Sequence, residues 1–130
     1  MKKKEQFNPT PSELAILQIL WKEGPATVRE IHDILAEEKE VVYTTILKTM
    51  QVMYDRRMLT REAQGRKHIY AAAIGEDATQ TALLDKFVDR TFGGSAMQMV
   101  MKALGSNKTS QKELEELKKY IDDIENKQRS

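Results

Sequence analysis

Apolar residues recur every three or four positions over most of the chain, which predicts a mainly α-helical protein. A first helix begins at the run TPSE (residues 10–13), where a hydroxyl cap, a proline and a glutamate form a capping box. Its apolar stripe includes Leu14, Leu17 and Trp21, and Gly24 followed by Pro25 ends it.

Two further helices follow closely. The run TVRE (residues 27–30) is a second capping box, and the inward row of a short second helix consists of Val28, Ile31, Ile34 and Leu35. A polar turn, EEKE (residues 37–40), leads directly into a helix over residues 42–57. Two helices joined by so short a turn predict a helix-turn-helix motif.

The helix over residues 42–57 has two unlike faces. One face is apolar and predicts core packing, through Tyr43, Ile46, Leu47, Met50, Met53 and Tyr54. The other face carries short hydroxyls, an amide and cations, which suit a DNA major groove, and we predict DNA contacts at Thr44, Thr45, Lys48 and Gln51. An amphipathic helix with a threonine-rich surface explains the same pattern, and Thr44 could instead cap the helix.

A β-hairpin is predicted after this helix. Extended runs over residues 58–63 and 68–72 flank the loop QGRK (residues 64–67), which places Arg66 and Lys67 at the hairpin tip. Three helices followed by a hairpin with a basic tip predict a winged helix-turn-helix DNA-binding domain over residues 1–75. The alternative for the hairpin is a structural loop with incidental charge.

Residues 76–130 predict a C-terminal all-helical domain. One helix ends at Gly93-Gly94, a second covers residues 95–104, and a third follows the capping box SQKE (residues 110–113). The apolar surface exceeds what so small a domain can hide, so we predict homodimerisation through Leu83, Phe87, Val88, Phe92, Met97, Val100, Met101, Leu104, Leu114, Leu117, Ile121 and Ile124. The alternative is a monomer in which these helices fold back on the winged helix.

Composition excludes several function classes. The chain has no cysteine, so it has no disulfide, thiolate metal site or cysteine nucleophile. Its two histidines lie on different elements; we expect His32 on a solvated face and His68 on the wing surface. With no phosphate-binding glycine loop either, we predict a protein that is not an enzyme and that uses no metal or cofactor. No apolar run is long enough to cross a membrane, so we expect a cytoplasmic protein without membrane insertion.

Charge is unevenly distributed. The formal net charge is only +1, which argues against nonspecific coating of nucleic acid. Residues 42–70, however, hold six basic and two acidic side chains, and residues 30–40 hold five acidic side chains and one basic. Basic charge is therefore gathered around the threonine-rich helix.

The order of several motifs resembles a known family. The motifs are SELAILQILW (residues 12–21), VREI (28–31), VYTTILKTM (42–50), GRKHIY (65–70), FVDRTFGG (87–94) and ELEELK (113–118). Together they are similar to the penicillinase, methicillin-resistance and copper-transport repressor family of bacterial winged-helix transcriptional regulators. The resemblance implies a homodimeric repressor that binds a palindromic double-stranded DNA operator through its recognition helix, with Thr44, Thr45 and Lys48 at the DNA-contacting positions of that helix.

The resemblance also bears on regulation. The copper-responsive branch ends in a cysteine-rich metal tail, which is absent here. The β-lactam branch is released from DNA by cleavage at an Asn-Phe pair, where an ungapped match places Lys102 and Ala103, and it implies a membrane sensor protease system as partner. Two alternatives stay open: a winged-helix protein-interaction module without DNA, and a repressor controlled by a small ligand near Met97, Met99 and Met101.

Overall fold

The computed structural model describes residues 7–106 and 108–129. It divides into two compact units, of which the first ends at Asp85 and the second starts at Lys86. This division falls inside helix α4 (Glu76–Phe92), whereas the sequence placed the domain boundary just before that helix.

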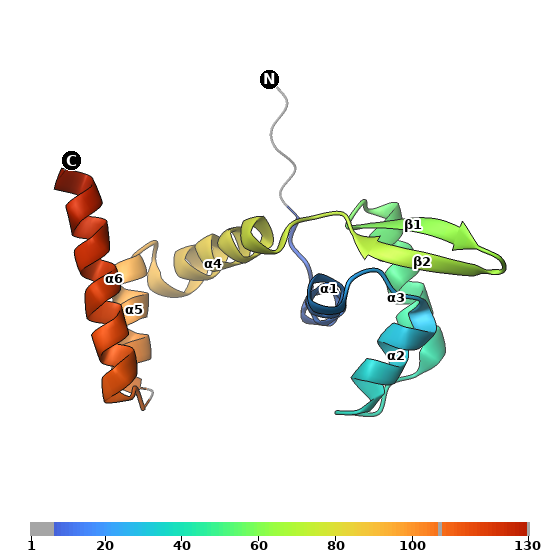
Figure 1. The fold of residues 1–130 in the computed structure, drawn as a ribbon, viewed down its shortest axis with the longest axis horizontal. Helices are drawn as coiled ribbons and strands as arrows, with labels where there is room; N and C mark the ends of the chain where they lie inside the picture. Colours follow the sequence, from blue (N-terminus) through green and yellow to red (C-terminus); the bar gives the residue numbers. More distant parts are fainter. Residues whose placement is uncertain (1–6, 107, 130) are drawn as a thin grey trace, which may run out of the picture. The chain divides into compact units, whose positions relative to one another are not determined.

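The first unit has the predicted winged helix-turn-helix architecture (Figure 1). Its elements are α1 (Pro11–Glu23), α2 (Val28–Ala36), α3 (Tyr43–Asp55), β1 (Leu59–Gln64) and β2 (Lys67–Ala72). The strands form an antiparallel hairpin, and Ala26 adds an isolated bridge to Tyr70. The Trp21 indole N–H donates to the carbonyl oxygen of Ile74 at 2.9 Å, which ties α1 to the segment that follows the hairpin.

The predicted capping boxes are confirmed. At α1, Thr10 Oγ1 accepts from the Glu13 N–H at 3.2 Å while the Thr10 N–H donates to Glu13 Oε1 at 2.9 Å. Thr27 and Glu30 make the same reciprocal pair at α2, at 3.2 and 3.0 Å. These bonds satisfy backbone donors that the first helical turn otherwise leaves unpaired.

The core of the first unit lies between the three helices and the hairpin. The apolar face predicted for α3 is confirmed, because Ile46, Met50 and Met53 are buried. They pack with residues from the other elements, including Ile16, Leu17, Ile31, Met58, Leu59 and Tyr70.

One predicted core position is wrong. Ile34 is 37% exposed and borders a surface hollow with Ala15 and Ile19 of α1. The nine-residue α2 buries Val28 and Ile31 and packs Leu35 partly against the core, which leaves Ile34 at the edge of its apolar face.

Two element boundaries also differ from the prediction. Helix α3 is shorter than residues 42–57, with Val42 and Arg56 as its caps. The hairpin turn contains only Gly65 and Arg66, because strand pairing continues to Gln64 and Lys67. Gly65 has a φ of 63°, a conformation that a glycine supplies in a tight two-residue hairpin turn.

The second unit contains the end of α4, then α5 (Ala96–Ser106) and α6 (Gln111–Arg129). Gly93 and Gly94 follow α4 with φ values of 59° and 90°, as expected for a glycine stop. The third capping box is present, with Ser110 Oγ accepting from the Glu113 N–H at 3.1 Å. Helices α5 and α6 contain no buried residue among those described. No helix within the described ranges has the length and apolar content that a membrane span requires.

Candidate nucleic-acid interface

Helix α3 exposes the polar row that the sequence predicted. Thr44, Thr45, Lys48 and Gln51 are all exposed, while the opposite face of the helix enters the core. Thr49 is less exposed and donates its hydroxyl to the carbonyl oxygen of Thr45 at 2.8 Å. The fixed packing of one face therefore determines which side chains the other face presents.

Part of this row borders a surface hollow beside the start of α1. Thr44, Thr45, Lys48 and Thr49 line it from α3, and Thr10 and Ser12 line it from α1. In the sequence, Thr10 and Ser12 indicate only a helix start, because their proximity to α3 arises from tertiary packing. Gln51, Arg66 and Lys67 do not line this hollow.

Two cations near α3 have partners within the fold. Arg56 Nη1 lies 3.5 Å from Glu13 Oε2, a carboxylate whose side chain is only 7% exposed. The guanidinium carbon of Arg61 lies 3.9 Å from the centre of the Tyr54 ring. The pKa of Arg61 is raised, chiefly by a hydrogen bond to Tyr70. The Glu13 carboxylate therefore offsets part of the charge of Arg56, whereas Arg61 keeps its charge but is held against the Tyr54 ring.

The hairpin presents a second basic site. Arg66 and Lys67 are exposed, as predicted for its tip. Two hydrogen bonds from Thr27, the first from its backbone, lower the pKa of Glu30, and the positive charge of Lys67 lowers it further. Lys67 on the hairpin therefore contributes to the charge environment of Glu30 in the first turn of α2.

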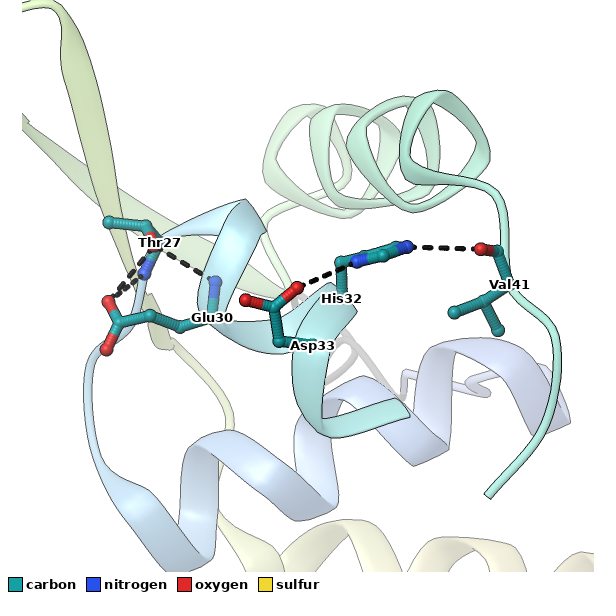
Figure 2. A network of polar contacts seen from close by, with 5 residues as sticks. All are labelled: Thr27, Glu30, His32, Asp33 and Val41. Carbon is teal, nitrogen blue, oxygen red and sulfur yellow. Dashed lines mark hydrogen bonds and ion pairs between the residues drawn. The ribbon is translucent and has the colours of Figure 1, made fainter. Parts of the chain in front are cut away.

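His32 is not on a solvated face, so that prediction is wrong. Its side chain is 17% exposed, and Nδ1 lies 3.0 Å from Asp33 Oδ1 (Figure 2). Nε2 lies 3.1 Å from the carbonyl oxygen of Val41, just before α3. No residue pattern predicts this contact, because its acceptor is a backbone atom across the turn. His68 is exposed on β2, as predicted.

Thr44 does not cap α3. The N-cap is Val42, which makes no side-chain capping bond. The hydroxyl of Thr44 is thus not used to start the helix.

The residues predicted for dimerisation differ in exposure. Leu83, Phe92 and Leu114 are half-buried, and Val88 is already buried at 6% exposure within the single chain. The others are exposed: Phe87, Met97, Val100, Met101, Leu104, Leu117, Ile121 and Ile124. Lys102 and Ala103 lie inside α5 and are also exposed.

No metal-binding cluster of histidine or carboxylate residues was found within the described ranges. The geometry offers instead a polar helix face, a basic hairpin tip and a separate apolar surface.

The family model described as penicillinase repressor matches residues 9–123. The chain belongs to the penicillinase repressor family. It is 24% identical to the penicillinase repressor of Staphylococcus aureus over 123 residues, which cover 95% of this chain and 98% of the relative. It is 29% identical to the transcriptional regulator BlaI of Mycobacterium tuberculosis over 73 residues, which cover 55% and 53% of the two chains.

Membership makes the chain a transcriptional repressor by family rather than an enzyme. A solved structure, the transcriptional regulator Tm0710 from Thermotoga maritima, is 19% identical with a TM-score of 0.48, covering 88% of this chain and 78% of that one.

Proposed function

We propose that this repressor binds a palindromic DNA operator as a homodimer, with α3 in the major groove and the hairpin tip against the phosphate backbone. The observation that carries the proposal is the exposed row Thr44, Thr45 and Lys48, held outward by the buried face of α3. Residues in the first turn of a recognition helix come closest to base edges. Thr44 and Thr45 therefore read bases, and Gln51 contacts the same groove from the middle of the helix.

The cations have a different role. Lys48, Arg66 and Lys67 contact phosphates, which fixes register and orientation without reading sequence. Arg56 and Arg61 contribute less, because Glu13 and Tyr54 already hold them.

The second unit supports the dimer. Met97 and Met101, one helical turn apart on α5, are 68% and 66% exposed, and Leu117 and Ile121 are exposed on α6. A soluble monomer rarely leaves so large an apolar area in contact with water. A second copy of the chain would cover these faces and bring two α3 helices to half-sites about 34–36 Å apart.

The salt dependence of DNA affinity tests the phosphate contacts. Lys48→Ala and Arg66→Ala should each reduce the magnitude of the slope of log K against log salt by about 0.9 per lost contact, hence by about 1.8 for a homodimer that loses one contact in each subunit. The reason is that a phosphate without its lysine or arginine keeps its condensed counterions when the protein binds. Lys22→Ala is the matched control, since Lys22 lines the hollow between α1 and α2. An unchanged slope in the Lys48 and Arg66 variants would show that these side chains do not contact phosphates.

The base-reading role needs a specific sequence. Selection from a random duplex library would supply the operator. Thr45→Ala should then cost about 1–3 kcal/mol on that operator and much less on unrelated DNA. Equal losses on both would mean that Thr45 only positions the backbone.

A charge on α5 tests the dimer. Met101→Glu should shift the chain from dimer to monomer in sedimentation equilibrium, because association would bury an unpaired carboxylate. Gln98→Glu adds the same charge at another exposed position of α5 and is the control. A Met101→Glu protein that remains dimeric would contradict this interface.

A further inference from the structure

Helix α3 starts differently from the other capped helices. Thr10, Thr27 and Ser110 each form a capping box, whereas Val42 makes no side-chain bond at the start of α3. The side chain of His32 in α2 instead reaches the residue before this start, with Nε2 3.1 Å from the carbonyl oxygen of Val41. Its ring also meets the Tyr43 ring edge to face, with centroids 5.8 Å apart.

The two hydrogen bonds of His32 require two donors. Asp33 Oδ1, 3.0 Å from Nδ1, belongs to a carboxylate, and the Val41 oxygen belongs to a carbonyl. Both partners only accept. A neutral imidazole has one N–H, so one of these contacts would set a lone pair against an acceptor. Only an imidazolium can donate to both of the acceptors that lie beside the ring in Figure 2.

We propose that His32 is a positioning residue for DNA recognition: with Nδ1–H donating to Asp33, Nε2–H holds the Val41 carbonyl at the start of α3, and loss of the Nε2 proton releases Val41. The proposal rests on the proposed function, since it assumes that α3 reads DNA. Operator affinity then falls as the pH rises and the imidazolium loses its proton.

Other charged groups lie near His32, but they ordinarily keep their charge between about pH 5 and 8. Arg29 of α2 lies over the Tyr43 ring at 4.3 Å from its centre. The turn after α2 borders the same hollow as His32 and carries Glu37, Glu38, Lys39 and Glu40. Histidine is the only side chain that ordinarily titrates between about pH 5 and 8. The chain has just one other histidine, His68 on the hairpin.

The DNA-free full-length protein provides the first test. Imidazole ¹⁵N spectra should show both His32 nitrogens protonated at about pH 6, a value in the range where histidine titrates. The backbone amide of Val42, which shares a peptide plane with the Val41 carbonyl, should shift with the same midpoint. A single neutral tautomer at that pH, or a Val42 amide that does not follow His32, overturns the proposal.

The second test measures operator affinity at both ends of this range. The wild-type protein should bind roughly two- to tenfold more weakly at about pH 8 than at about pH 6, the change expected from one hydrogen bond. His32→Gln should bind almost equally at both, because its amide donates to the Val41 carbonyl at any pH. His32→Leu should bind weakly at both pH values. If the leucine variant fails to fold, the pH dependence of His32→Gln still tests the proposal.

His68→Gln is the matched control and should keep the full pH dependence. If His68→Gln loses the pH dependence, the titrating group behind it is His68 on the hairpin, and the proposal is overturned. An affinity independent of pH in the wild-type protein, together with a titrating His32, overturns it as well. Failure to bind any duplex at either pH refutes the proposed function instead, while the spectra still report on the bond between His32 and Val41.

Discussion

The two units of this chain use their apolar residues in opposite ways. In the first unit, Leu17, Ile31, Met50 and Met53 are completely buried. In the second, α5 and α6 bury no described residue, and Met97 remains 68% exposed. Helices and a hairpin that enclose one core can fold alone, whereas helices with open apolar faces depend on a partner. The first unit therefore encloses a core of its own, whereas the apolar faces of α5 and α6 remain open.

The largest expected effect comes from removing the second unit. A chain that ends at Asp85 keeps the first unit, so it should fold and recognise a half-site. On a palindrome its affinity should fall roughly 10²- to 10⁴-fold, because the second contact is no longer intramolecular. Gel shifts on the intact operator measure this loss. Equal affinity of the truncated and full-length chains would contradict the dimer.

That the first unit would be a winged helix was predictable from local signals. The capping residues Thr10 and Thr27 stand beside their own partners in sequence, and the period of α3 revealed its buried face. Gly65 predicted the hairpin, because a tight turn between two extended runs favours a glycine. Each of these features depends on residues a few positions apart, so the sequence alone displays them.

The candidate site was predictable only in part. The exposure of Thr44, Thr45 and Lys48 on one face was predictable because one helix carries them all. The Glu13 and Arg56 pair and the stacking of Arg61 on Tyr54 were missed, because each joins elements that tertiary packing brings together. The bond from His32 to Val41 was missed for a further reason: its acceptor is a carbonyl group, which every residue has.

A matched pair of leucines tests the comparison within one chain. Leu17→Ala should cost about 2–5 kcal/mol in the free energy of unfolding, because it leaves a cavity in the first core. Leu104→Ala, at a position that is 40% exposed, should cost far less at concentrations where the chain is monomeric. Urea unfolding of dilute protein measures both. Equal losses would mean that Leu104 is buried in the monomer.

A cap at the surface of the first unit should matter less than its core. Thr27→Ala should cost about 1 kcal/mol of unfolding free energy, because the capping box at α2 is lost. Since hydrogen bonds from Thr27 lower the pKa of Glu30, their contribution is complete above the ordinary carboxyl range and fades as the pH falls through the lowered value. The difference between wild type and Thr27→Ala should therefore shrink in acid. Thr27→Ser keeps the hydroxyl and should retain this pH dependence.

The smallest expected effect concerns backbone strain at Arg57, directly after α3. Arg57 has a φ of 67°, a left-handed conformation in which a side chain costs about 1 kcal/mol or more. This conformation lets the chain reverse after α3, so that the Met58 N–H donates to the Met53 carbonyl at 2.8 Å and Met58 enters the core. Arg57→Gly removes the strain, Arg57→Ala keeps it, and both remove the same cation. The glycine variant should therefore be more stable than the alanine variant by about 0.5–1 kcal/mol in urea unfolding, after glycine's larger entropy loss on folding is deducted. Equal stabilities would show that the reversal after α3 is unstrained, and that the first core does not have to offset it.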